Sequence, residues 1–266
     1  MLKYLCVGHV CMDVYSDGFK LGGTASFAAK VAKALGYEVT VLTSFGPDFE
    51  FVTGFEEIRL INIEADKTTI FENTYTENGR TQILHNKAKN LMITDCINEK
   101  FDIIHFCPIA DEIDFALVDA LIHKCTLSLT TPQGWMRQWK EDKKVFYKPI
   151  DWKLLSQIDF TIISDEDVPN LTDEIKNIQS SISKLIVTKG KNGASLYLDG
   201  IEKSYPAHPT KVKDTTGAGD TFAIAFISSY LKSRDFDFAM NYANGLAALC
   251  VGSDDWRFLK KINTVK

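Results

Sequence analysis

The sequence lacks a long apolar run and any excess of basic residues. No stretch approaches the ~20 consecutive apolar residues that a membrane-spanning helix needs. Asp and Glu number 35 against 30 Lys and Arg, a formal net charge of −5, which argues against a general nucleic-acid-binding surface. No internal repeat or low-complexity tract occurs. We therefore expect a soluble, cytoplasmic protein that binds neither membranes nor nucleic acids.

Cysteine motifs are also missing. None of the six cysteines forms a C-x-x-C pair, and none has zinc-ligand spacing to a histidine. Several lie inside apolar runs, as small buried hydrophobic residues do in a reducing compartment. The pattern indicates neither a disulfide framework nor a structural zinc site. The residues are Cys6, Cys11, Cys96, Cys107, Cys125 and Cys250.

Alternating strand and helix patterns fill most of the 266 residues. Strands are predicted at Leu2–Gly8, Glu38–Ser44, Phe101–Cys107, Cys125–Thr130, Asp159–Ser164 and Lys184–Thr188. Helices are predicted after Gly22-Gly23 and at Ile113–His123, Trp152–Gln157, Val168–Leu171 and Glu174–Ser183. This alternation predicts one α/β domain over residues 1–266, with a mainly parallel central sheet flanked by helices on both faces.

One segment breaks the alternation. Residues 67–89 contain two β-rich runs around Asn78-Gly79, a strong hairpin signal. Together with Ile58–Ile63, this hairpin is a candidate small sheet, a β lid inserted at about 58–89. An extra edge hairpin on the main sheet is the alternative.

The segment Lys211–Phe222 (KVKDTTGAGDTF) carries the chemistry. We expect a strand to lead into Asp214, followed by a Gly217-Ala218-Gly219 turn and a helix. N–H groups at a helix start lack intrahelical partners, and with the helix dipole they form an anion site. Asp220 would stand beside that anion, placed to take a proton from a hydroxyl that attacks a phosphate.

Other nucleotide and hydrolase motifs are not found. G-x-G-x-x-G is not completed, since Phe222 holds the last place, and no G-x-x-x-x-G-K-[ST] occurs. G-x-S-x-G and H-E-x-x-H are also missing. The anion site is therefore neither a Rossmann nor a P-loop site.

The string D-T-T-G-A-G-D-T-F closely resembles the C-terminal signature of the ribokinase (PfkB) family of carbohydrate and nucleoside kinases. The resemblance implies a ribokinase-like fold and phosphoryl transfer from ATP with Mg²⁺. It implies that Asp220 is the catalytic base. It also implies that Gly217, Ala218 and Gly219 form the anion hole.

The resemblance extends along the chain. Asp13 and the Gly22-Gly23 turn match the family's substrate-binding positions, and a turn aspartate is the alternative for Asp13. Thr188, Gly190 and Gly193 resemble the nucleotide loop. Asn244 falls on a helix that passes near the adenine in the family, although plain helix packing is at least as good an explanation.

Two departures affect the substrate and the metal. Ribokinase-like members usually carry an asparagine directly after the glycine pair, and it serves furanose substrates. No asparagine follows Gly23 here, which argues against ribose as the substrate. The family's N-x-x-E motif appears as Ser164–Asp167, which leaves Asp167 as the metal-binding candidate.

Short matches point to the myo-inositol kinase subgroup. Arg80 and Gln82 have the same strand parity and would reach a polyol from the lid; a solvent-facing pair is the alternative.

Arg137 follows a strand at the sheet's carboxyl edge and would contact phosphate; a surface position is the alternative. His9 is a candidate substrate contact, whereas His105 is predicted to be a core residue.

The predicted function is transfer of the γ-phosphoryl group of ATP to a hydroxyl of a small polyol or sugar, first of all a myo-inositol-like cyclitol. The alternatives are a nucleoside kinase of the same family, a non-catalytic nucleotide- or sugar-binding relative, and a structural partner. The protein would act as a monomer or a lid-mediated homodimer.

Overall fold

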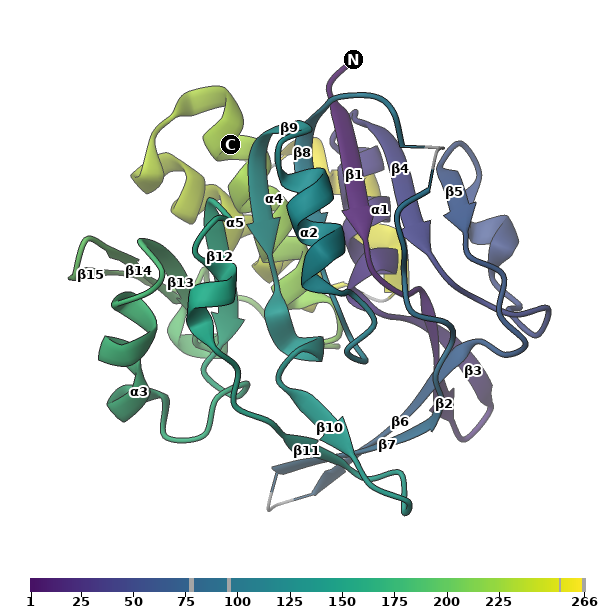
Figure 1. Cartoon of the computed structure of the whole chain (residues 1–266). Helices are drawn as coiled ribbons and strands as arrows, with labels where there is room; N and C mark the ends of the chain where they lie inside the picture. The colour runs from purple at the N-terminus through teal and green to yellow at the C-terminus, as the bar shows by residue number, and fades with distance from the viewer. Residues whose placement is uncertain (77–78, 95–96, 254, 265–266) are drawn as a thin grey trace.

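The computed structural model describes residues 1–76, 79–94, 97–253 and 255–264, and these form two main sheets with helices (Figure 1). The nine-stranded main sheet has the order β15-β14-β13-β12-β9-β8-β1-β4-β5. Its strands are β1 (Lys3–Val7), β4 (Glu38–Thr43), β5 (Arg59–Asn62), β8 (Phe101–Phe106), β9 (Cys125–Thr130), β12 (Phe160–Ser164), β13 (Lys184–Thr188), β14 (Ala194–Leu198) and β15 (Ile201–Tyr205). Every neighbouring pair from β5 to β13 is parallel, and β14 and β15 add antiparallel strands at one edge.

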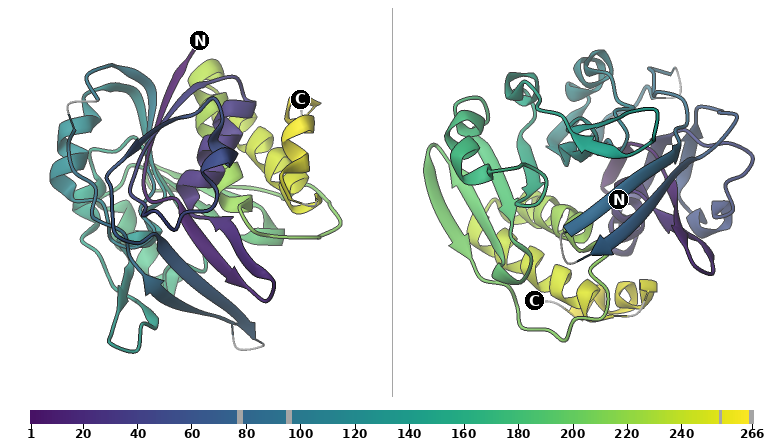
Figure 2. Two further views of the ribbon diagram at one scale, coloured as in Figure 1. Left: turned by 90° about the vertical axis from the view of Figure 1, so that its right-hand side faces the viewer. Right: turned by 90° about the horizontal axis from the view of Figure 1, so that it is seen from below.

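Helices cover both faces of the main sheet (Figures 1 and 2). Alternate side chains along β1 enter two different cores, as strand geometry requires. Tyr4 and Cys6 pack with residues of α1 (Thr24–Ala34), α4 (Ala218–Ser233) and α5 (Phe236–Val251). Leu5 and Val7 pack on the other face with α2 (Phe115–Ile122) and α3 (Leu171–Gln179). The predicted α/β architecture, a mainly parallel sheet with helices on both faces, is confirmed.

A small four-stranded sheet, the lid, lies below the carboxyl ends of the parallel strands (Figure 1). Its order is β3-β2-β6-β7, from β3 (Gly18–Gly22), β2 (Cys11–Tyr15), β6 (Thr69–Thr76) and β7 (Gly79–Asn86). The predicted hairpin is confirmed by the β6–β7 pairing, although Asn78 itself lies outside the described residues. A further hairpin, β10 (Arg137–Trp139) with β11 (Val145–Tyr147), meets the lid where Leu84 N donates to Lys143 O (2.9 Å).

The structure corrects the expectation for residues 58–63. Strand β5 pairs with β4 in the main sheet and does not join the hairpin. The lid is completed instead by β2 and β3 from the N-terminal segment, so its boundary does not follow the predicted insertion at 58–89. In the described residues β3 and β7 are the two edge strands of the lid, and β7 makes an isolated bridge from Ile83 to Lys144. A lid-mediated dimer stays a prediction.

Other local predictions were also wrong. No strand leads into Asp214: residues 206–217 form a loop that is mostly exposed. Of the predicted helix Val168–Leu171 only Leu171 is helical, because Asn170 has a left-handed φ of 53° and α3 begins at Leu171. The Trp152–Gln157 pattern forms a short 3₁₀ helix, Trp152–Leu155. The remaining 3₁₀ helices are Val52–Phe55, Pro132–Gly134, Gly190–Asn192 and Asp255–Thr264.

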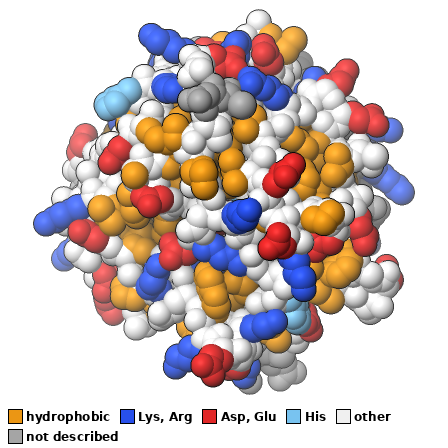
Figure 3. Space-filling model, turned by 45° about the vertical axis from the view of Figure 1, so that its right-hand side comes forward, with side chains coloured by type: hydrophobic (Ala, Val, Ile, Leu, Met, Phe, Trp, Pro, Cys, Tyr) orange, Lys and Arg blue, Asp and Glu red, His pale blue; other side chains and the backbone are white. Residues whose placement is uncertain are grey.

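No helix within the described ranges is long and apolar enough to cross a membrane. On the face shown in Figure 3, hydrophobic side chains form several patches separated by charged and other polar groups.

His105 is confirmed as a core residue with hydrogen-bonding partners. Its ring is fully buried, with Nδ1 2.8 Å from the Tyr4 hydroxyl and Nε2 2.9 Å from Thr131 Oγ1. Burial lowers its pKa from 6.5 to about 3, because a buried ring resists protonation.

This burial predicts acid sensitivity. Between pH 6.5 and about 3 the unfolded chain binds a proton at His105 that the folded chain does not, so stability falls as pH falls. From pH 7 to pH 5 we expect His105 to remove about 2 kcal/mol from the free energy of unfolding, measured by urea titration. The variant His105→Gln would lose that part of the pH dependence. Equal pH dependence in the two proteins would contradict the prediction.

Candidate active site

A large cleft lies between the lid and the N-terminal end of α4. Its volume is about 1430 Å³, which exceeds the roughly 300–1,000 Å³ of a typical single-ligand pocket. Loops that follow β8, β9, β12 and β13 contribute Ile109, Gln133, Asp167 and Gly190, so the cleft lies at the carboxyl edge of the sheet, where ligands bind in α/β folds. Of the predicted site residues, the cleft lining brings together Asp13, Gly23, Gln82, Arg137, Asp167, Thr188, Gly190, Gly193, Gly217, Ala218, Gly219, Asp220 and Asn244.

The α4 N-terminus presents the glycine turn to this cleft. Gly217 caps the helix in a left-handed conformation, with φ 75°. A Cβ atom there would lie 2.1 Å from Cδ1 of Phe27, so only glycine fits. The Thr221 N–H donates to Gly217 O at 2.8 Å and begins the helical hydrogen bonds. A helix leaves N–H groups of its first turn for an anion. Here the Ala218 N–H donates to Thr215 O (3.2 Å), and Gly219 and Asp220 follow in the same turn.

A polar ladder crosses the lid opposite this turn. Gln82 Nε2 donates to Asn73 Oδ1 (2.6 Å), and Asn73 Nδ2 donates to Asp13 Oδ1 (3.4 Å). The three side chains come from β7, β6 and β2, and all line the cleft. Asp13 is therefore a lid-strand residue rather than a turn residue at the end of the first strand.

The Gly22-Gly23 turn lies against the same carboxylate. A Cβ atom at Gly22 would lie 2.3 Å from Asp13 Oδ2, and one at Gly23 would lie 2.8 Å from His9 O. The paired glycines thus let the start of α1 approach β1 and β2. Gly22 supports Asp13, whereas Gly23 is part of the cleft lining.

Arg137 is not a surface residue: it is 8% exposed. Its Nη1 donates to Ile109 O (2.8 Å), and its guanidinium lies 5.3 Å from the ring centroid of Phe71 on the lid. Burial and the Asp13 carboxylate raise the pKa of the Cys11 thiol well above its ordinary value, while Arg137 opposes this rise. Asp13 and Arg137 therefore act with opposite sign on the buried Cys11, which packs with Phe71 and Ile109.

The side chain of Arg80 lies outside the described residues. Its backbone pairs with Tyr75, two positions from the Asn73–Gln82 pair. Its proposed role stays a prediction based on that strand position.

The other end of the cleft is formed by the loop after β13. The Lys189 N–H donates to Gly193 O (2.7 Å), which closes a tight turn over Gly190. Gly193 has φ 84°, and a Cβ atom there would lie 2.0 Å from Tyr205 O. The predicted glycines thus shape a loop whose backbone lines the cleft.

Asn244 is buried on α5, and its amide donates to Pro206 O (3.1 Å) and Tyr205 O (3.4 Å). These hydrogen bonds favour a packing role for Asn244. A contact between Asn244 and the nucleotide stays a prediction. The neighbouring wall is apolar and consists of Val212, Ala247, Ala248 and Val251.

Three acidic residues of the predicted metal region, Asp165, Glu166 and Asp167, line the cleft. Asp167 Oδ1 accepts from Gln133 Nε2 (2.9 Å), and Oδ2 accepts from Ser164 N (2.8 Å). Each carboxylate oxygen keeps further acceptor capacity, and carboxylates are the hard oxygen ligands that magnesium prefers. The residues present therefore fit a magnesium ion held largely through water and phosphate.

Sequence reasoning missed Asn73, and it missed the contact of Gln133 with Asp167. Asn73 is in register with Gln82 across the hairpin, so its face could have been inferred from the parity of Gln82 once the hairpin register was fixed. No local pattern links Gln133 to Asp167, which is 34 residues away.

The Asn73 ladder gives a direct test. Replacing Asn73 by Ala removes the link between Gln82 and Asp13, and we expect KM for a substrate bound beneath the lid to rise by about tenfold while kcat changes little. Steady-state kinetics at varied concentration of that substrate measures this. Thr81→Ala is the matched control, because Thr81 is exposed beside Gln82, where strand alternation points it to the opposite face. An equal rise in KM for both variants would contradict the prediction.

The fold and this cleft define a small-molecule kinase of the ribokinase-like class. Residues 1–259 match the pfkB family of carbohydrate kinases. The chain belongs to that family, and it is a phosphotransferase with an alcohol group as acceptor.

The relatives differ in their substrates. The chain is 25% identical over 261 residues to a cytidine kinase of Thermococcus kodakarensis, covering 89% of this chain and 91% of that protein. It is 26% identical over 251 residues to an inositol 3-kinase of Oryza sativa, covering 85% of this chain and 62% of the rice protein.

Among solved structures, one similar fold is a pyrophosphate-dependent kinase of the ribokinase family complexed with a pyrophosphate analog and myo-inositol. The TM-score is 0.83 at 19% identity, over 99% of this chain and 100% of that one. The nucleoside kinase of Methanocaldococcus jannaschii gives a TM-score of 0.70 at 18% identity, over 99% of each chain.

Proposed function

We propose that this kinase transfers the γ-phosphoryl group of ATP to a hydroxyl of a small polyol, with a myo-inositol-like cyclitol as the leading acceptor. One observation carries the proposal: the lid ladder and the glycine turn of α4 face a single cleft with room for two ligands. Asp220 lies where the glycine turn and the space beneath the lid meet, because it is in the first turn of α4 and lines the same cleft as the lid ladder.

The chemistry divides among named groups. Asp13, Asn73 and Gln82 bind acceptor hydroxyls, and Asp220 takes the proton from the attacking hydroxyl. The backbone N–H groups around Gly217–Gly219 stabilise charge on the transferred phosphoryl group. A magnesium ion near Asp167 would neutralise charge on the donor phosphates.

The choice of a polyol rests on the polar ladder. A carboxylate and two carboxamides present several donors and acceptors side by side, which suits a ring bearing hydroxyls on neighbouring carbons. The similarity to the rice inositol 3-kinase and to the kinase complexed with myo-inositol agrees with this acceptor class.

A nucleoside is the second candidate acceptor. Phe146, which is 41% exposed, and Tyr147 line the cleft from β11, and aromatic faces of this kind stack on bases. The likeness to a cytidine kinase points the same way.

Two donors also need to be compared. The apolar wall of Val212, Ala247, Ala248 and Val251 beside the β13 loop favours a donor with a base, and therefore ATP. Pyrophosphate would leave that wall uncovered, and Val212 is 62% exposed. Because the similar kinase complexed with myo-inositol is pyrophosphate-dependent, pyrophosphate is the donor to test against ATP.

The test is a matrix of donors and acceptors. ATP or pyrophosphate, each with Mg²⁺, is combined with inositol isomers, pentoses, hexoses and nucleosides, and phosphorylated acceptor is measured directly by mass spectrometry and phosphorus NMR. Highest kcat/KM with ATP and an inositol supports the proposal. Preference for a nucleoside or for pyrophosphate overturns that part of it, and binding without turnover favours a non-catalytic relative.

A further inference from the structure

His9 joins the main sheet to both legs of the lid hairpin. It lies two residues after the end of β1, is fully buried, and is not part of the cleft lining in the described chain. Its Nδ1 lies 2.8 Å from Oγ1 of Thr69, the first residue of β6, and its Nε2 lies 2.8 Å from O of Lys89, just beyond β7. The same Thr69 hydroxyl oxygen accepts from Ala88 N (3.0 Å). His9 therefore does not contact the acceptor, and its ring contacts the two ends of the hairpin instead.

These contacts define one protonation state. A carbonyl oxygen only accepts, so Nε2 carries the proton that bonds to Lys89 O. Burial lowers the His9 pKa, so the ring is neutral and Nδ1 is an acceptor. The Thr69 hydroxyl consequently donates to Nδ1 while its oxygen accepts from Ala88. Three hydrogen bonds therefore each have a single donor-to-acceptor direction: from Ala88 N to Thr69 Oγ1, from Thr69 Oγ1 to His9 Nδ1, and from His9 Nε2 to Lys89 O.

Glu112 fixes the backbone from which the His9 ring extends. Its fully buried carboxylate accepts from His9 N (2.9 Å), Ile109 N (3.0 Å) and Ala110 N (2.7 Å). The same Ile109 residue supports Arg137 through its carbonyl oxygen. The Glu112 carboxylate thus links the backbone of His9, through Ile109, to the buried guanidinium of Arg137.

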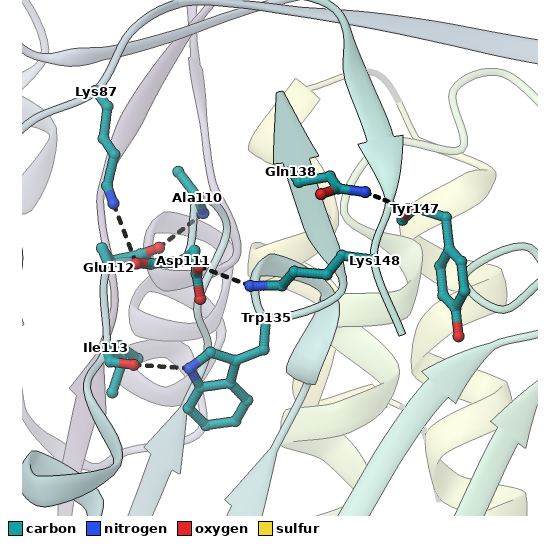
Figure 4. Close-up of polar contacts among 9 residues, drawn as sticks. All are labelled: Lys87, Ala110, Asp111, Glu112, Ile113, Trp135, Gln138, Tyr147 and Lys148. Atoms are coloured by element: carbon teal, nitrogen blue, oxygen red, sulfur yellow. Dashed lines mark hydrogen bonds and ion pairs between the residues drawn. The ribbon is translucent and has the colours of Figure 1, made fainter. Parts of the chain in front are cut away.

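Figure 4 shows that the second leg of the hairpin also contacts this loop. Lys87 Nζ donates to Asp111 O (3.1 Å), and Lys148 forms an ion pair with the Asp111 carboxylate (2.8 Å). Further along, Leu91 N donates to Glu112 O (2.9 Å). The loop 109–113 is therefore the base on which the lid is fixed.

We propose that His9 is a positioning residue for the acceptor: as the Nε2–H tautomer it holds both legs of the lid hairpin, so that Asn73 and Gln82 meet the acceptor at a fixed place beside Asp13. The proposal rests on the proposed acceptor role of that ladder. Loosening the anchor would weaken acceptor binding without altering Asp220 or the donor loop.

The test variant is Thr69→Val, which keeps the shape of the side chain but removes the hydroxyl. We expect KM for the acceptor to rise at least about tenfold, with KM for the donor and kcat at saturating acceptor nearly unchanged. Thr69→Ser restores the hydroxyl and is expected to restore the acceptor KM. Tyr4→Phe is the matched control, because it removes a 2.8 Å hydrogen bond to the other buried histidine, His105, in the main-sheet core.

Two measurements without substrate separate the anchor from the proposed function. Nitrogen-15 spectra of the histidine rings are expected to show His9 protonated only at Nε2, and amide hydrogen exchange is expected to accelerate in β6 and β7 in Thr69→Val but not in Tyr4→Phe. A different tautomer, unchanged lid exchange, or an unchanged acceptor KM in an active enzyme overturns the proposal. If the wild type phosphorylates no acceptor, the proposed function fails, and the exchange rates alone decide whether the anchor stands.

Discussion

Replacing Asp220 by Asn is expected to lower kcat by about 10²–10⁴-fold, the usual contribution of a general base. The carboxamide has nearly the same shape but does not accept the hydroxyl proton. In the proposed mechanism binding depends on the lid ladder and the donor loop, so KM for both substrates should change little and the loss should appear in kcat. Steady-state kinetics with the substrates identified by the donor–acceptor matrix measures the effect.

Asp214→Asn is the matched control for this variant. Asp214 lies in the same loop, and its Oδ1 accepts from Thr216 N at 2.8 Å, a bond that the asparagine oxygen retains. We expect near wild-type kcat for this control. If Asp220→Asn kept more than about a tenth of the wild-type kcat, Asp220 would not be the base.

Replacing Gly217 by Ala should lower kcat by about 10²–10³-fold, comparable with loss of an oxyanion-hole donor. Two effects act together. The left-handed φ of 75° is unfavourable for alanine, and its Cβ would lie 2.1 Å from the Phe27 ring. That ring is held by Trp256, with the centroids 4.5 Å apart. The turn must therefore shift, and the N–H groups of the proposed anion hole would shift with it.

The control for Gly217→Ala is Gly200→Ala in the β14–β15 turn. Gly200 also has a positive φ, 83°, but a Cβ atom there meets nothing within 4 Å. This control should lose about 1–2 kcal/mol of stability from backbone strain and keep its kcat. A folded Gly217→Ala protein with wild-type kcat would remove the anion-hole role.

The local features of the site were predictable from the sequence. Gly217 requires a conformation that other residues avoid, and the helix beginning at Ala218 follows from residues next to it in the chain. The parallel sheet was predictable for a similar reason, because strand and helix patterns alternate along the chain. The N-G pair likewise predicted the β6–β7 hairpin.

Strand partners were not predictable in the same way. Residues 59–62 read as a β-rich run whether they pair with β4 or with the hairpin, and the pairing with β4 depends on long-range contacts. Asp13 followed the first strand closely enough to be read as its end, yet a new strand begins at Cys11 and joins the lid.

Sequence alone therefore determined the chemistry that local backbone geometry enforces: a glycine turn, a helix N-terminus and an acid in its first turn. Only the tertiary structure decided which side chains share the cleft. It buried Arg137 against Phe71, placed Asn73 between Asp13 and Gln82, and assigned His9 to the lid legs instead of the substrate. The physical reason is that φ preferences and helix ends depend on neighbours in the chain, whereas burial and hydrogen-bond partners depend on residues that the fold brings together from distant positions.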